Sequence, residues 1–149
     1  MLGPARWTFT IAVGAVDRQG RLARFSSQGE EVDICAPGED VLSAAPGSGY
    51  AKMSGTSMAT PFVSGVVALM LAKHRRHGGA TPLNTVNDLR EHLARTATDA
   101  GPTGHDPHYG FGLINPTGLV RDAAVLFPIM QMGPLAVNGV EGMLVFQPR

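Results

Sequence analysis

Residues 53–65 read MSGTSMATPFVSG, and this stretch decides how the rest of the chain is interpreted. Its serine, Ser57, lies among small residues directly before a long apolar run. The run continues to Lys73 with apolar or small residues on every face, which predicts a long helix that begins near Ser57 and is buried on all sides. The helix ends in KHRRHGG, where cationic side chains meet the negative end of the helix dipole and glycines favour a left-handed cap.

The position of Ser57 at a helix N-terminus allows two interpretations. The first residues of a helix leave backbone N–H groups without intrahelical acceptors, and these groups stabilise an oxyanion. Small neighbours also let a substrate backbone come close. Ser57 is therefore a candidate nucleophile, and its predicted substrate and oxyanion surroundings are Gly55, Thr56 and Met58. The alternative is that Ser57 is only a helix cap, a common role for serine.

A nucleophilic serine needs a general base, usually oriented by a carboxylate. The chain has five histidines. His74 lies 17 residues further along the same helix, which at ~1.5 Å per residue puts it roughly 25 Å away, and His77 is farther still. His92 is expected on a second helix, at the boundary of its apolar stripe. None of these three is placed to serve Ser57.

The other histidines, His105 and His108, lie in a loop that also holds Asp99 and Asp106. Ser57, then Asp99 or Asp106, then His108 would follow the chain order of an α/β-hydrolase triad, so an esterase with Ser57, Asp106 and His108 stays open. That fold needs further strands after the nucleophile helix, whereas a helix and a loop follow here. We interpret the loop as solvated. We predict no metal site in it, because its clustered ligands lack a further partner.

The segments before Ser57 predict strands. TFTIAVGAVD (8–17) and EVDICAPG (31–38) are apolar, as strands buried on both faces of a parallel sheet are. VLSAAP (41–46) predicts a third strand, and GSGYAKMSGTS (47–57) predicts a loop or short hairpin. The fold class is therefore α/β, with strands first and helices after them.

A second helix is predicted after the first, with Thr81 as its N-cap and Pro82 as its first helical residue. Its apolar stripe is predicted to consist of Val86, Leu89 and Leu93. Its exposed face is predicted to carry Asp88, Arg90 and Glu91. A loop over 98–112 and a short helix over 116–124 are expected to follow.

The composition fits one globular domain. The 149 residues are 44% apolar and 16% charged, which allows a sizeable core. Lys plus Arg and Asp plus Glu number 12 each, so nothing points to nucleic acid, and no apolar stretch is expected to span a membrane. The single cysteine, Cys35, excludes a disulfide scaffold. We predict a domain over 1–127 and an extension over 128–149, with a hairpin at Asn138-Gly139.

Several motifs together resemble the subtilisin-like serine proteases, or subtilases. They occur in the family's order and spacing, and they are IAVGAVD (11–17), FSSQG (25–29), VDICAPG (32–38), GTSMATPFVSGVVALM (55–70) and YGFGLIN (109–115). The resemblance covers about Thr8 to Ala124. It implies a partial subtilisin-like fold, with parallel strands followed by a buried central helix and peripheral helices. It also implies that Ser57 hydrolyses peptide bonds through an acyl-enzyme.

The resemblance also implies what this sequence does not carry. In the family, the catalytic aspartate, the histidine of an H-G-T-H-like segment and the oxyanion-hole asparagine all precede the IAVGAVD strand, and no such motif occurs here. The chain therefore resembles the C-terminal half of a catalytic domain, with Phe62 where many relatives have histidine. We expect the chain alone to be inactive. We expect a polypeptide substrate for the complete enzyme and a complementary N-terminal half as partner.

A non-catalytic role is the main alternative: a truncated or degenerate protease module used for binding, with exposed strand edges and apolar faces. No cofactor is predicted from the residues, and calcium is implied by the resemblance only. The resemblance further implies that the full-length parent is secreted or extracytoplasmic. The N-terminus, MLGPARW, does not have the apolar region of a signal peptide.

Overall fold

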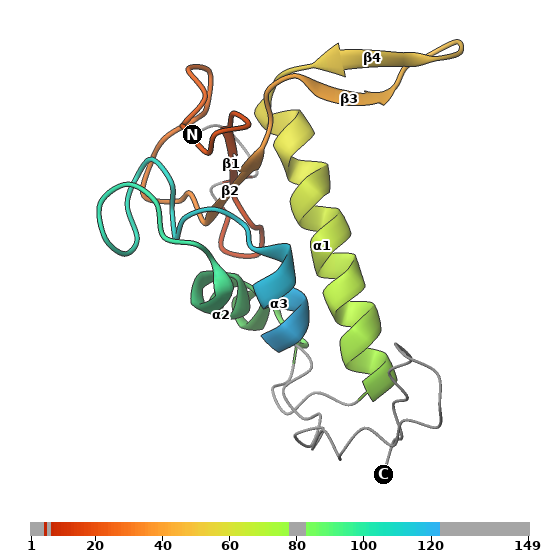
Figure 1. The fold of residues 1–149 in the computed structure, drawn as a ribbon. Helices are drawn as coiled ribbons and strands as arrows, with labels where there is room; N and C mark the ends of the chain where they lie inside the picture. The colour runs from red at the N-terminus through yellow and green to blue at the C-terminus, as the bar shows by residue number, and fades with distance from the viewer. Residues whose placement is uncertain (1–4, 6, 78–82, 123–149) are drawn as a thin grey trace, which may run out of the picture.

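The computed structural model describes residues 5, 7–77 and 83–122, and it has the predicted order of strands followed by helices (Figure 1). The elements are β1 (Val13–Val16), β2 (Ile34–Pro37), β3 (Val41–Ala44), β4 (Tyr50–Met53), α1 (Thr56–His77), α2 (Val86–Thr96) and α3 (Pro116–Asp122). The predicted extension over 128–149 and its hairpin lie outside the described residues.

The strands β1 and β2 form a parallel pair, as predicted, with Gly14 opposite Cys35 in the register. A Cβ atom on Gly14 would lie 2.5 Å from the Cys35 sulfur, so glycine is required where the two strands meet. Both outer edges are covered at the centre of the pair. On β1, the Ala15 amide donates to the Ser26 hydroxyl, and the Ala15 carbonyl accepts a hydrogen bond from the Ala23 amide. On β2, the Cys35 amide and carbonyl make hydrogen bonds to the backbone of residues 112–114. The expectation of exposed strand edges is therefore wrong at these positions.

In the part of the chain that the structure describes, one face of the long helix α1 is packed and the other face is exposed. Its buried residues are Ala59, Val63 and Met70, and it contacts β1, β2 and α3. The side chains of Phe62 and Leu69 are 44% and 65% exposed. The prediction that α1 is buried on all sides does not hold among the described residues, because β1, β2 and α3 lie along one flank of the helix (Figure 1).

The same helix meets the length and composition that a membrane span would need, over Thr56–Arg76. This differs from the prediction that no apolar stretch reaches that length. The observation is weak evidence for a membrane, since a core helix of a soluble protein meets the same criteria. In this structure the packed face of α1 contributes to two hydrophobic clusters, one with β1 and β2 and one with α2 and α3.

The predicted third strand is β3, and it pairs with β4 in an antiparallel hairpin, from Val41 opposite Met53 to Ala44 opposite Tyr50. The hairpin therefore spans both segments, whereas the sequence predicted a loop or short hairpin within 47–57 alone. Glycines with positive φ, Gly47 and Gly49, make its turn. The hairpin projects away from the other elements (Figure 1), and all residues of β4 are exposed. It leads the chain from the end of β2 directly to the start of α1.

The helix α2 begins later than predicted, with Thr85 rather than Thr81 as its N-cap. The Thr85 hydroxyl accepts a hydrogen bond from the Asp88 amide, and the Asp88 carboxylate accepts bonds from the amides of Thr85 and Asn84. These backbone bonds hold the pKa of Asp88 below its ordinary value. This reciprocal capping box satisfies three backbone donors with two side chains, and it therefore fixes the helix start.

Replacing Thr85 with alanine is expected to destabilise the chain by about 1 kcal/mol, because the capped N–H group loses its acceptor. Chemical denaturation monitored by circular dichroism measures this difference. Thr85→Ser is the control, since serine keeps the accepting hydroxyl and should retain the stability of the parent chain. Equal losses in the two variants would contradict the capping role.

Candidate active site

Ser57 is the second residue of α1, and its side chain is exposed. Among the described residues, its hydroxyl makes no hydrogen bond to a backbone N–H, so the alternative that Ser57 is a helix cap is wrong. The preceding turn is fixed to the sheet by a 2.8 Å hydrogen bond from the Gly55 amide to the Gly38 carbonyl, directly after β2. Ser57 therefore lies at the carboxyl end of the parallel strands, where α/β sheets bind their ligands.

Small residues permit the close approach that holds Ser57 in this position. A Cβ atom on Gly38 would lie 2.7 Å from the Ala15 Cβ and 2.8 Å from the Gly55 carbonyl oxygen. Ala59 is fully buried below the first turn of α1. Gly38 was not among the site residues predicted from the sequence, although the APG ending of β2 was a visible signal.

The backbone around Ser57 offers a hydrogen-bond donor suited to an oxyanion. Among the described residues, no group accepts a hydrogen bond from the Ser57 N–H, whereas the Met58 N–H is bonded to the Gly55 carbonyl at 3.0 Å. The Thr56 carbonyl accepts a hydrogen bond from the Thr60 hydroxyl at 2.9 Å, within the first turn of α1. The Ser57 N–H, at the positive end of the α1 dipole, can therefore stabilise negative charge on a bound carbonyl oxygen.

Two of the described histidines, His92 and His105, make contacts elsewhere in the fold. His92, expected at a boundary, is 2% exposed, and its ring nitrogens contact the Leu119 carbonyl and Arg95. The His105 ring contacts the Val32 carbonyl at 2.9 Å. Within residues 5, 7–77 and 83–122, no side chain is hydrogen-bonded to the Ser57 hydroxyl.

The loop over 98–112 is packed against β2 and is not simply solvated as predicted. Asp106 is 4% exposed, and one of its carboxylate oxygens accepts the backbone amides of His108 and Tyr109. The Tyr109 hydroxyl accepts a hydrogen bond from the Leu22 amide. Asp106 therefore stabilises a turn, and it does not orient the ring of His108 as the esterase alternative would need.

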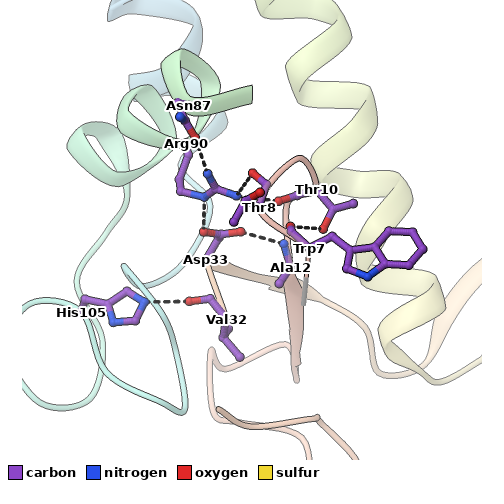
Figure 2. Close-up of polar contacts among 9 residues, drawn as sticks. All are labelled: Trp7, Thr8, Thr10, Ala12, Val32, Asp33, Asn87, Arg90 and His105. Atoms are coloured by element: carbon purple, nitrogen blue, oxygen red, sulfur yellow. Dashed lines mark hydrogen bonds and ion pairs between the residues drawn. The ribbon is translucent and has the colours of Figure 1, made fainter. Parts of the chain in front are cut away.

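A partly buried ion pair, which the sequence did not predict, holds the segment before β1 in place (Figure 2). The Arg90 Nε atom lies 2.6 Å from one Asp33 oxygen, and the other Asp33 oxygen accepts the Ala12 amide at 2.8 Å. Arg90 also donates to the carbonyls of Thr8 and Thr10. The prediction that Arg90 faces outward is wrong, because these acceptors draw its guanidinium into the fold.

Neither the cysteine nor the titratable groups suggest a different chemistry. Burial, and secondly the charge of Asp106, raises the pKa of the Cys35 thiol to about 12, so Cys35 is not a thiolate nucleophile at neutral pH. In the part of the chain that the structure describes, no three His, Cys, Asp or Glu side chains cluster in a way that could hold a metal ion.

Comparison with protein families gives a match over residues 2–112 to the subtilase family. Subtilisin E of Bacillus subtilis (strain 168) is 46% identical over 112 residues, which is 75% of this chain and 27% of that protein. M-protease of Shouchella clausii (strain KSM-K16) is 44% identical over 118 residues, 79% of this chain and 28% of that protein. The chain thus spans less than a third of the length of either relative.

Solved structures with the same fold are also proteases. The self-cleaved protease domain of PatA gives a TM-score of 0.69 at 36% identity and covers 80% of this chain and 43% of that one. The prenylagaramide maturation protease PagA gives a TM-score of 0.68 at 34% identity and covers 80% and 44%. The partial subtilisin-like fold that the resemblance implied is therefore confirmed, and this chain belongs to the subtilase family of serine proteases.

Proposed function

We propose that this chain is the nucleophile-bearing part of a subtilisin-like endopeptidase, with Ser57 as the attacking residue. The observation that supports this most is the position of Ser57, which is exposed on the first turn of α1 at the carboxyl end of β2. Its own N–H makes no hydrogen bond to a described group. These are the positions that a nucleophile and an oxyanion donor need in acyl transfer.

The proposed reaction follows the serine-protease scheme for which subtilisin is a known example. The Ser57 oxygen attacks the carbonyl carbon of a peptide bond, and a histidine outside the described residues accepts the hydroxyl proton. The oxyanion accepts a hydrogen bond from the Ser57 N–H. Collapse of the tetrahedral intermediate breaks the C–N bond, and the histidine protonates the amine that leaves. Water then hydrolyses the acyl-enzyme by the same steps.

The chain by itself is proposed to lack the base and the orienting carboxylate, and hence to be inactive until a complementary N-terminal half supplies them. The substrate would be a polypeptide, and the complete enzyme would act outside the cytoplasm, as the family resemblance implied. The Ser57 hydroxyl has no hydrogen-bond partner among the described residues, which supports this proposal. Calcium binding stays a family-based expectation.

Casein turnover tests this proposal. We expect no hydrolysis by the pure chain, and hydrolysis after addition of the segment of subtilisin E that precedes the matched region. Turnover by the pure chain that is lost in Ser57→Ala would contradict the missing base. Absence of turnover in a verified one-to-one complex would instead favour the non-catalytic alternative, a binding module, which the exposed apolar face of α1 also supports.

A further inference from the structure

The loop that follows β1 carries an arginine at every third position, namely Arg18, Arg21 and Arg24. Over residues 17–25 the one acidic residue is Asp17, so three positive charges and one negative charge leave a local net charge of +2. The whole chain has a formal net charge of zero. This segment, which we call the arginine loop (17–25), is therefore more positive than the chain as a whole.

Asp17 fixes the shape of the arginine loop. Its carboxylate accepts hydrogen bonds from the amides of Gln19 and Arg21 at 2.8 and 2.9 Å, and from the Arg21 Nε atom at 2.7 Å. The Asp17 amide donates to the Arg21 carbonyl, and Gly20 takes a positive φ of 78° in the turn. The loop is thus a closed turn, and the Arg21 side chain helps to hold it together.

The other two arginines are available to a ligand. Arg18 and Arg24 are exposed, and among the described residues neither side chain makes a hydrogen bond or an ion pair. A guanidinium group offers five donors in a planar fork that matches a carboxylate. Two exposed guanidinium groups on a fixed turn therefore form a surface that is complementary to acidic side chains.

The arginine loop returns along β1, at the end of the fold that holds Ser57. The Ala23 amide donates a 3.0 Å hydrogen bond to the Ala15 carbonyl on β1. Ala23 also shares a hydrophobic cluster with Ala59, which follows Ser57 by two residues on α1. Figure 1 shows the loop after β1 at the same end of the molecule as the N-terminus of α1. Arg24, directly after Ala23, therefore lies in the neighbourhood of the candidate active site.

We propose that the arginine loop selects polypeptide substrates with acidic side chains near the bond that Ser57 attacks, with Arg24 as the specificity-determining residue and Arg18 as a second charge. This proposal rests on the proposed function, because it names the substrate class of the same site. An exposed ion pair contributes little to affinity, so each arginine should change the Kd by about threefold. The two charges together also attract acidic segments from a distance, and salt screens this attraction.

Paired peptides test the arginine loop in the full chain, with Ser57→Ala in the background to prevent cleavage. The two labelled peptides are identical, except that one carries glutamates and the other carries glutamines on both sides of the central residue. Fluorescence anisotropy measures the Kd of each peptide at low and at high salt. We expect the glutamate peptide to bind about threefold to tenfold more tightly at low salt. In 1 M salt, where the Debye length is ~3 Å, the two peptides should bind equally.

Substitutions assign the preference to particular side chains. Arg24→Gln should lower the preference by about threefold, and Arg18→Glu combined with Arg24→Glu should reverse it. These variants should keep the Tm of the parent, because neither side chain has a partner among the described residues. Arg75→Glu is the matched control, since it reverses an exposed charge on α1 at 18 residues from Ser57, or roughly 27 Å along the helix. It should retain the preference.

Several results would overturn the proposal. Equal binding of the two peptides at low salt, or binding of neither, would do so. Retention of the preference in the double charge reversal, or its loss in Arg75→Glu, would also contradict the role of the loop. A single-stranded oligonucleotide is the competitor, and tighter binding of it than of the glutamate peptide would assign the loop to nucleic acid instead.

The outcomes separate this proposal from the proposed function. Both peptides are also offered as substrates to the chain with Ser57 intact, after addition of the same segment of subtilisin E as in the casein assay. Charge-selective binding without turnover would leave the role of the arginine loop standing and overturn the catalytic proposal. Turnover of both peptides at equal rates, with no charge preference in binding, would do the opposite.

Discussion

Replacing Ser57 with alanine should abolish casein hydrolysis by the complex of this chain with its complementary half. We expect a loss on the order of 10⁶-fold in kcat, which is the known value for subtilisin, a member of the same family, when its nucleophile is removed. The physical reason is that no acyl-enzyme can form without the hydroxyl, whereas binding of the substrate is unaffected. Initial rates at saturating substrate measure the change.

Two features make this substitution a clean test. The Ser57 side chain is exposed and makes no hydrogen bond to a described residue, so the alanine variant should keep the Tm of the parent. Ser64→Ala is the matched control, because Ser64 is an exposed serine on the same helix. A loss of similar size in both variants would indicate damage to α1, and full activity of Ser57→Ala would contradict the assigned nucleophile.

Replacing Arg90 with alanine is expected to destabilise the chain by about 3–5 kcal/mol, because it leaves the Asp33 carboxylate buried without its charged partner. The two side chains are only 24% and 10% exposed and meet at 2.6 Å. The variant also removes the donors to the carbonyls of Thr8 and Thr10. Because single domains are stable by only about 5–15 kcal/mol, this is a large fraction of the total. Urea denaturation measures the loss.

An exposed ion pair in the same chain provides the control. Arg21 and Asp17 meet at 2.7 Å, but the Arg21 side chain is 76% exposed, so Arg21→Ala should cost at most about 1 kcal/mol. If Arg90→Ala does not fold, Arg90→Lys is informative, since lysine keeps the charge but not the planar set of donors. It should lie between the parent and the alanine variant. Equal losses for Arg90→Ala and Arg21→Ala would contradict the role of burial.

Local patterns were sufficient for some elements and insufficient for others. The strand β3 and the glycine-rich turn after it were predictable, because turn glycines and a short apolar run act over a few residues, whereas the pairing of β3 with β4 was not predicted. The start of α2 was not, because Thr81-Pro82 and Thr85 with Asp88 are both valid start signals within a few residues. The structure uses the second, in which a carboxylate and a hydroxyl satisfy the backbone donors together.

The sequence by itself determined the order of strands and helices, the long helix that begins near Ser57, and the family to which the motifs belong. Only the tertiary structure decided that Arg90 turns inward to Asp33, that Asp106 holds a packed loop, and that α1 is covered on one flank. The physical reason is distance along the chain. Periodicity reports that a helix has apolar faces, whereas the partners that cover each face come from segments tens of residues away.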